Sequence, residues 1–255
     1  MRELDMDRAS LDVAARYKRC AGQWQAHLER TRALILRAAL LTGKRRKAVI
    51  LGAGLLHDVP LAELSALFDA VVLVDVVHSR ACQMQASLFP NVSCVQADVT
   101  GTALQLIEAR KTGGRLPRKE PDLFCDDLCV DFTVSVNLLS QLGCAPAEFL
   151  RSSHAPEEIR AFQRHLIESH LEYLRQRPGH SALITDVAWS RRPANRPLAQ
   201  PVGRRDVLHQ VVLPPPTEVW DWLIAPAPEA EPEHDLLAHV AGYPDWKGAN
   251  QILCA

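Results

Sequence analysis

The chain has 255 residues, with 29 Lys and Arg against 30 Asp and Glu, so its formal net charge is −1 at pH 7. Hydrophobic residues make up 47% and charged residues 23%, which is typical of globular proteins and excludes disordered and fibrous classes. A charge this close to zero provides no broad attraction to nucleic acid. Composition therefore indicates a globular protein and leaves its chemistry to the motifs.

The seven cysteines are scattered along the chain and include no C-x-x-C pair. Their spacing predicts neither a disulfide framework nor a zinc site, and we expect no metal. The acidic N-terminus, with Glu3, Asp5 and Asp7, is not typical of a secretory signal. The longest apolar stretch, 33–41, contains Arg37 and is far shorter than the ~20 residues that span a bilayer. We expect a cytoplasmic protein without a membrane partner.

The first forty residues have the pattern of a helix. Trp24, Leu28, Thr31, Ile35 and Ala38 recur at steps of three and four, which places them on one face. Thr42-Gly43 is a typical helix stop. We therefore divide the chain into a helical extension or lid over 1–43 and an α/β domain over 44–255.

Short runs of apolar residues then alternate with helical stretches, notably the helix predicted over 156–177. Such unbroken runs, rich in β-branched residues, are typical of parallel strands buried on both faces. The alternation predicts a doubly wound, mostly parallel sheet of the Rossmann-like kind. The predicted parallel strands are 48–51, 71–74, 92–97, 132–136 and 182–185.

Two later runs, 219–224 and 236–240, are joined by a polar, Pro-rich connector and predict a C-terminal antiparallel pair. Before them, residues 189–216 hold six prolines and five arginines and interrupt the alternation.

Small and polar residues follow the predicted strands. Gly52-Ala53-Gly54 follows the first, Asp75 the second, Asp98 the third and Asn137 the fourth. In an open parallel sheet, ligands bind at the carboxyl ends of the strands. A Gly-x-Gly turn lets a ligand approach the backbone, and an acid at the end of the second strand can accept both hydroxyls of a ribose. The alternative is that Asp75 and Asp98 only start turns.

In this order the segments resemble the class I S-adenosylmethionine-dependent methyltransferases. The resemblance covers roughly residues 45–190 and implies that the sheet ends in the antiparallel hairpin. It implies S-adenosylmethionine as cofactor and S-adenosylhomocysteine as product, with Gly52 and Gly54 facing the methionine moiety, Asp75 holding the ribose and Asp98 beside the adenine. The full set expected at the cofactor is Gly52, Ala53, Gly54, Asp75, Val76, Asp98, Val99 and Asn137. Lys47, where the family often has an acid, and Asn137, where it often has Asp, depart from the family pattern.

A nicotinamide-dependent oxidoreductase is the competing interpretation within this fold. Its fingerprint needs a third glycine, where the helix packs tightly on the strand, and His57 stands at that position. This difference favours a methyl donor over a dinucleotide. We expect the neighbouring Asp58 to cap the following helix.

The predicted function is methyl transfer to a small molecule or short peptide, with no catalytic residue assigned. The alternatives are a structural-RNA methyltransferase, a non-methylating enzyme that uses the same cofactor, and a non-catalytic partner subunit. RNA is the less favoured partner, because a net charge of −1 gives no overall attraction to phosphates. The arginines of 189–216 are the main support for RNA. The candidate substrate residues, taken from the N-terminal helix, the glycine loop and the last parallel strand end, are Tyr17, Trp24, His27, His57, Asp186 and Trp189.

Overall fold

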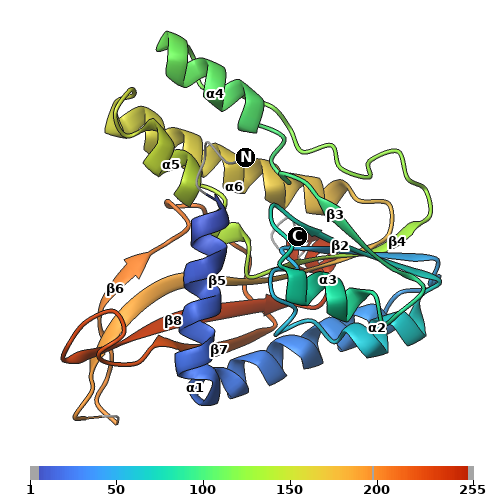
Figure 1. Cartoon of the computed structure of the whole chain (residues 1–255), viewed down its shortest axis with the longest axis horizontal. Helices are drawn as coiled ribbons and strands as arrows, with labels where there is room; N and C mark the ends of the chain where they lie inside the picture. Colours follow the sequence, from blue (N-terminus) through green and yellow to red (C-terminus); the bar gives the residue numbers. More distant parts are fainter. Residues whose placement is uncertain (1–5, 197, 252–255) are drawn as a thin grey trace.

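The computed structural model describes residues 6–196 and 198–251; Glu3 and Asp5 lie outside the described residues. Within these described ranges, one eight-stranded sheet has helices on both faces (Figure 1). The strands are β1 (Lys47–Leu51), β2 (Ala70–Asp75), β3 (Val92–Gln96), β4 (Val130–Val136), β5 (His180–Pro193), β6 (Val202–Asp206), β7 (Glu218–Ala225) and β8 (His234–Tyr243). The helices are α1 (Met6–Leu40), α2 (Leu61–Leu67), α3 (Arg80–Ala86), α4 (Ala103–Thr112), α5 (Cys144–Leu150), α6 (Pro156–Gln176) and α7 (Trp246–Gln251), with a 3₁₀ turn η2 (Leu139–Gln141).

The strand order is β3-β2-β1-β4-β5-β8-β7, with β6 paired to β5 outside this path. Strands β1 to β5 are mutually parallel, whereas β8 is antiparallel to both of its neighbours, β5 and β7. The predicted fold class is confirmed: a doubly wound, mostly parallel sheet with a C-terminal antiparallel pair and an N-terminal helix. After β1, the strands β2 and β3 are added on one side of β1, and β4 and β5 are then added on its other side. The topological switch point therefore lies between β1 and β4.

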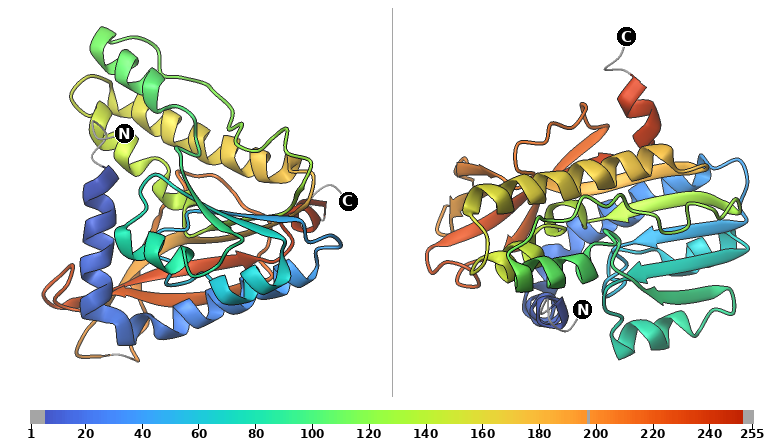
Figure 2. Two further views of the ribbon diagram at one scale, coloured as in Figure 1. Left: turned by 45° about the vertical axis from the view of Figure 1, so that its right-hand side comes forward. Right: turned by 90° about the horizontal axis from the view of Figure 1, so that it is seen from above.

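Alternate residues of the central strands enter two different cores, as the two-residue period of a strand requires. Ala48 and Ile50 of β1 pack with α1, α2 and α3 on one face, while Val49 and Leu51 pack with α4, α5 and α6 on the other. Figure 2 shows the same two helical layers from two further sides. Both faces of β1 are therefore buried, which explains its unbroken apolar run.

Helix α1 bends at Cys20, whose φ of −114° and ψ of 15° are not helical. After the bend, its residues enter the main core through Leu34, Ile35, Ala38 and Ala39. Figures 1 and 2 show the part before the bend rising beside the ends of the strands, while the part after it runs along one face of the sheet. The first part is thus placed where a cover would be, and the second part belongs to the sheet packing.

The Pro- and Arg-rich segment contains structure that its composition does not indicate. Strand β5 continues to Pro193, beyond its parallel part, and β6 pairs antiparallel with this extension. All five residues of β6 are exposed. A strand with no buried face has no hydrophobic pattern, and for this reason the sequence predicts none here.

We predict that Gly179→Ala destabilises the fold strongly. A Cβ at Gly179 would overlap the main-chain oxygen and carbon of Asp131 and lie 2.6 Å from its Cα, so the start of β5 would have to move away from β4. Overpacking against backbone is expected to lower the free energy of unfolding by about 3 kcal/mol or more. Urea unfolding measures this loss. Gly43→Ala is the matched control, because a Cβ there meets no atom within 4 Å; equal stabilities of the two variants would contradict the prediction.

Candidate functional site

The glycine loop, residues 52–60 between β1 and α2, lies at the switch point between β1 and β4. Gly52 has a φ of +77° and Gly54 a φ of +50°, backbone conformations that side chains rarely adopt. A Cβ on Gly52 would lie 2.8 Å from the carbonyl oxygen of Val136 and 3.0 Å from Leu138 Cβ. The amides of Gly52 and Ala53 both donate to the carbonyl of Val74. The loop therefore lies close against the ends of β2 and β4, and at Gly52 only glycine fits.

Asp75, at the end of β2, is bonded to this loop. Its Oδ2 accepts the amide of Gly54 at 2.7 Å and its Oδ1 accepts the amide of Val77 at 3.3 Å. Burial raises the pKa of Asp75, against the lowering effect of these amide bonds. Each carboxylate oxygen can accept more than one hydrogen bond, so Asp75 keeps acceptor capacity for hydroxyl donors while the backbone fixes its orientation.

Asp98 uses its carboxylate to organise its own turn. It accepts the amide and hydroxyl of Thr100, and the amides of Thr102 and Ala103, at 2.7–3.0 Å. These bonds satisfy amides at the start of α4, the turn-forming role that its residue type also allows. Val99 beside it is buried in the core, and the carbonyl of Val76 accepts the side chain of Gln96.

Asn137 connects the end of β4 to the glycine loop. Its φ of +48° is left-handed, a region that Asn tolerates better than most residues. Its amide nitrogen lies 2.8 Å from Asp58 Oδ2 and 3.2 Å from His27 Nε2. The expectation that Asp58 caps α2 is wrong: the N-cap is Pro60, without a side-chain cap bond, and the Asp58 carboxylate pairs with Asn137 instead. Arg32 of α1 supports the same loop by donating to the carbonyl of His57.

Hydrogen bonds link Trp220, His27, Asn137 and Asp58 into one network, and they determine where its protons lie. Trp220 donates its indole N–H to His27 Nδ1 at 3.0 Å, and burial lowers the pKa of His27 to about 3. Neutral His27 therefore carries its proton on Nε2, which must donate toward Asn137. As placed, Asn137 directs its amide nitrogen at this donor and leaves its oxygen without a partner. Turning the amide by 180° exchanges the two atoms, so that the oxygen accepts from His27 and also from Asp58, provided that Asp58 is protonated. Burial raises the pKa of Asp58 in the required direction. The network therefore predicts a neutral Asp58.

The three aromatic candidates on α1 separate into two groups. Tyr17 stacks on His57 of the glycine loop, with ring centroids 3.5 Å apart. Trp24 donates to the carbonyl of Ile224, and His27 stacks on Trp222 at 3.9 Å, so both pack against β7 and are buried. Only Tyr17 of the three thus meets the loop directly, while His27 acts on it through Asn137.

Asp186 and Trp189, the candidates on β5, are bonded to one another. Trp189 Nε1 donates to Asp186 Oδ2 at 2.6 Å, and Ser140 of η2 donates to Oδ1. Asp186 is buried, which raises its pKa. The structure therefore brings these side chains together next to the end of β4. Sequence reasoning missed Ser140, although it follows Asn137 by three residues, because its partner is 46 positions away.

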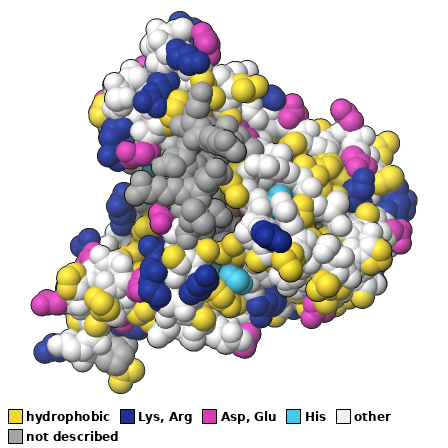
Figure 3. All heavy atoms as spheres, in the orientation of Figure 1, with side chains coloured by type: hydrophobic (Ala, Val, Ile, Leu, Met, Phe, Trp, Pro, Cys, Tyr) yellow, Lys and Arg dark blue, Asp and Glu magenta, His cyan; other side chains and the backbone are white. Residues whose placement is uncertain are grey.

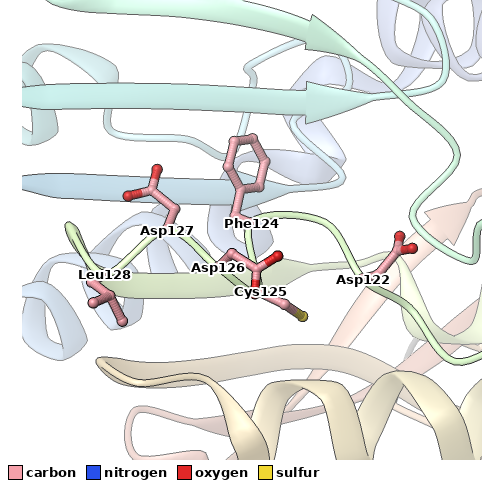
Figure 4. Close-up of a pocket in the computed structure, with 6 residues that line it drawn as sticks. All are labelled: Asp122, Phe124, Cys125, Asp126, Asp127 and Leu128. Carbon is pink, nitrogen blue, oxygen red and sulfur yellow. The ribbon is translucent and has the colours of Figure 1, made fainter.

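A depression of about 610 Å³ lies away from this edge of the sheet. It is lined by the loop that leads into β4, including Asp122, Phe124, Cys125 and Asp127 (Figure 4). This loop precedes β4, so it lies at the amino end of the strand, opposite to Asn137. Ligand sites in open parallel sheets lie at the carboxyl ends. The strand-end cluster is therefore the better candidate site.

No family model matches the chain, and no curated protein matches it. Solved structures resemble it weakly. The N-methyltransferase NodS from Bradyrhizobium japonicum WM9, in complex with S-adenosylhomocysteine, is 15% identical over 85% of this chain and 87% of its own, with a TM-score of 0.37. The Burkholderia thailandensis 1,6-didemethyltoxoflavin-N1-methyltransferase is 14% identical over 93% and 89%, with a TM-score of 0.35. The 23S rRNA methyltransferase ErmE is 11% identical over 82% and 68%, also with a TM-score of 0.35.

We predict that the stability contribution of Asp58 falls as the pH rises. A raised pKa means that the folded protein keeps the Asp58 proton above the ordinary value of 3.8, where the unfolded chain loses it. Rising pH then favours the unfolded state until Asp58 ionises in the folded protein. The free energy of unfolding of the wild type, minus that of Asp58→Asn, should therefore decrease from pH 4 upward.

Urea unfolding at several pH values measures this difference. Asp131→Asn is the control of opposite sign, because the hydrogen bond from Arg46 lowers the pKa of Asp131, so its contribution is lost toward acid pH. A difference for Asp58 that stays flat across the range would show that its carboxyl has an ordinary pKa, and would contradict the neutral network.

Proposed function

We propose that the chain binds S-adenosylmethionine at the carboxyl ends of β1, β2 and β4 and transfers its methyl group. The observation that carries this proposal is the Gly52–Gly54 loop at the switch point, bonded through the amide of Gly54 to Asp75. By the resemblance noted above, the glycines face the methionine moiety and Asp75 holds the ribose. A Cβ on Gly54 would lie 3.9 Å from Asp75 Oδ2, so its absence keeps the loop backbone open beside this acid. The Asp75 carboxylate keeps acceptor capacity that suits the ribose hydroxyls.

The position of His57 supports a methyl donor over a dinucleotide. A third glycine of the dinucleotide fingerprint lets the helix pack closely on the strand. Here an imidazole occupies that position, and its ring is stacked against Tyr17. The loop is thus built around a bulky side chain, unlike a dinucleotide fingerprint.

The residues of the site suit a reaction that depends on positioning. Methyl transfer from a sulfonium is an in-line displacement and needs no covalent nucleophile. Asn137, Asp58 and Arg32 hold the loop, and Asp75 is oriented by two amides. We assign these residues to positioning and propose no general base.

The charge distribution supports a small molecule or short peptide as the methyl acceptor. Of the arginines in 189–216, Arg191 pairs with Glu231 at 2.5 Å and Arg192 with Asp235 at 2.9 Å. Figure 3 shows basic side chains on the visible face in separate groups, with acidic ones among them. Binding to many phosphates needs a concentrated cationic surface. Structural RNA stays the alternative acceptor, supported by the remaining arginines of this segment.

We propose that the first part of α1 covers the site from the side of the glycine loop. The stacking of Tyr17 on His57 supports this role.

Within the described residues, no helix is both long and apolar enough to cross a membrane. The cytoplasmic location stays a prediction.

Asp75→Ala is predicted to weaken S-adenosylhomocysteine binding by about 10- to 150-fold, since hydrogen bonds to a charged group contribute about 1.5–3 kcal/mol. Isothermal titration calorimetry measures the change. Asp69→Ala, an exposed acid before β2, is the control and should bind as the wild type does. Absence of binding by the wild-type protein to either S-adenosylmethionine or S-adenosylhomocysteine, together with binding of NAD, would overturn the assignment.

Tyr17→Ala is predicted to weaken cofactor binding while leaving the fold intact, because Tyr17 touches the loop from the part of α1 outside the main core. We expect a fewfold to tenfold increase in Kd, since an aromatic pair contributes about 0.5–1.5 kcal/mol. Lys18→Ala, an exposed neighbour, is the matched control. An unchanged Kd would remove the support for a cover formed by α1.

The products of the reaction separate the remaining alternatives. After incubation with labelled S-adenosylmethionine and cell extract, methyl transfer releases S-adenosylhomocysteine. Methylthioadenosine as the product would instead identify a non-methylating enzyme. Binding without any turnover would support a non-catalytic partner subunit.

A further inference from the structure

Three side chains from consecutive elements meet beside the predicted ribose acid. His78 follows β2, Cys82 lies in α3 and Cys94 lies in β3. One nitrogen of His78 and the sulfurs of Cys82 and Cys94 all lie within 4.8 Å of one another. Cys82 is buried, whereas His78 and Cys94 are partly exposed, so the group is reachable from one side.

One separation within this group, between His78 Nδ1 and Cys82 Sγ, matches a tetrahedral zinc ion. With Zn–S bonds of about 2.3 Å and Zn–N bonds of about 2.0–2.1 Å, tetrahedral angles place nitrogen and sulfur about 3.6 Å apart, and two sulfurs about 3.8 Å apart. The distance between His78 Nδ1 and Cys82 Sγ is 3.6 Å. An ion therefore requires little movement of these two ligands.

The tautomer of His78 is set by its second nitrogen. Nε2 lies 3.1 Å from the carbonyl oxygen of Val95, which can only accept, so Nε2 carries the proton. The lone pair is then on Nδ1, the atom that faces Cys82. Histidines that bind metals typically donate their other N–H to a carbonyl or carboxylate in this manner.

Neighbouring groups hold the sulfur ligands in place. The amide of Cys82 donates to Ser79 Oγ at 3.1 Å, which fixes the start of α3 relative to the loop that carries His78. Cys94 is held by the ladder between β2 and β3, where it pairs with Leu73. The three ligands thus come from backbone that is ordered by other contacts.

We propose that His78, Cys82 and Cys94 bind one Zn²⁺ ion, through Nδ1 and the two sulfurs, with water as the fourth ligand. Both thiols release their protons when the ion binds. The ion joins the loop after Asp75 to α3 and β3, and so stiffens one wall of the candidate site. This departs from the sequence expectation of no metal, because the ligands come from separate elements and form no C-x-x-C motif. The proposal is independent of the cofactor that the protein uses.

Competition with a chromophoric chelator measures Zn²⁺ affinity of the full-length, reduced protein, and Co²⁺ substitution reports the ligands. We expect one equivalent of Zn²⁺, and a Co²⁺ spectrum with thiolate charge-transfer bands and tetrahedral d–d bands. Cys94→Ser and His78→Gln, both at partly exposed positions, should each weaken Zn²⁺ binding by at least about 100-fold, since even the loss of a group that only supports a ligand costs 10- to 100-fold. Circular dichroism checks that both variants are folded.

The matched control is Cys125→Ser combined with Cys129→Ser, two exposed cysteines in the loop before β4. This variant should keep the Zn²⁺ affinity and the Co²⁺ spectrum of the wild type. The proposal is overturned if the reduced wild-type protein binds no Zn²⁺, or if folded Cys94→Ser and His78→Gln bind it as tightly as the wild type. If only the control variant lost the Co²⁺ spectrum, the metal would bind in the loop before β4, and this result would also overturn the proposal.

Discussion

The candidate site depends on one close approach between main chains. At Gly52 the loop after β1 passes so near the end of β4 that a Cβ would lie 2.8 Å from the Val136 carbonyl. This approach brings the loop amides to the end of β2, where Val74 accepts two of them and Asp75 accepts a third. The absence of one side chain thus joins three strand ends into a single surface at the switch point.

A series of hydrogen-bonded polar side chains in the interior supports that surface. It runs from Trp220 of β7 through His27 of α1 to Asn137 of β4 and Asp58 of the glycine loop. Partly satisfied polar groups in a low-dielectric interior are costly, so this series favours one arrangement of its members. The last strand pair and the N-terminal helix are therefore coupled to the loop, although neither contains a glycine-loop residue.

The sequence predicted the central strands well because their burial on both faces leaves unbroken apolar runs, as in β1 and β2. It missed β6, where all side chains are exposed, and it assigned Asp58 to a helix cap because Asp has that local preference. Strand-end residues such as Asp75 and Asn137 were predictable from the order of the elements. The hydrogen-bond partners of such residues were not predictable, because they depend on tertiary packing that local patterns do not encode. Asn137 and its partner Asp58, for example, are 79 positions apart in the chain.

Hydrogen exchange with and without S-adenosylhomocysteine, read by mass spectrometry, tests most directly whether the switch point is the cofactor site. We predict slower exchange in peptides covering 52–58 and 75–78, with no change in the loop 122–128 that lines the depression before β4. Protection confined to 122–128, or no protection anywhere in the presence of saturating S-adenosylhomocysteine, would contradict this assignment.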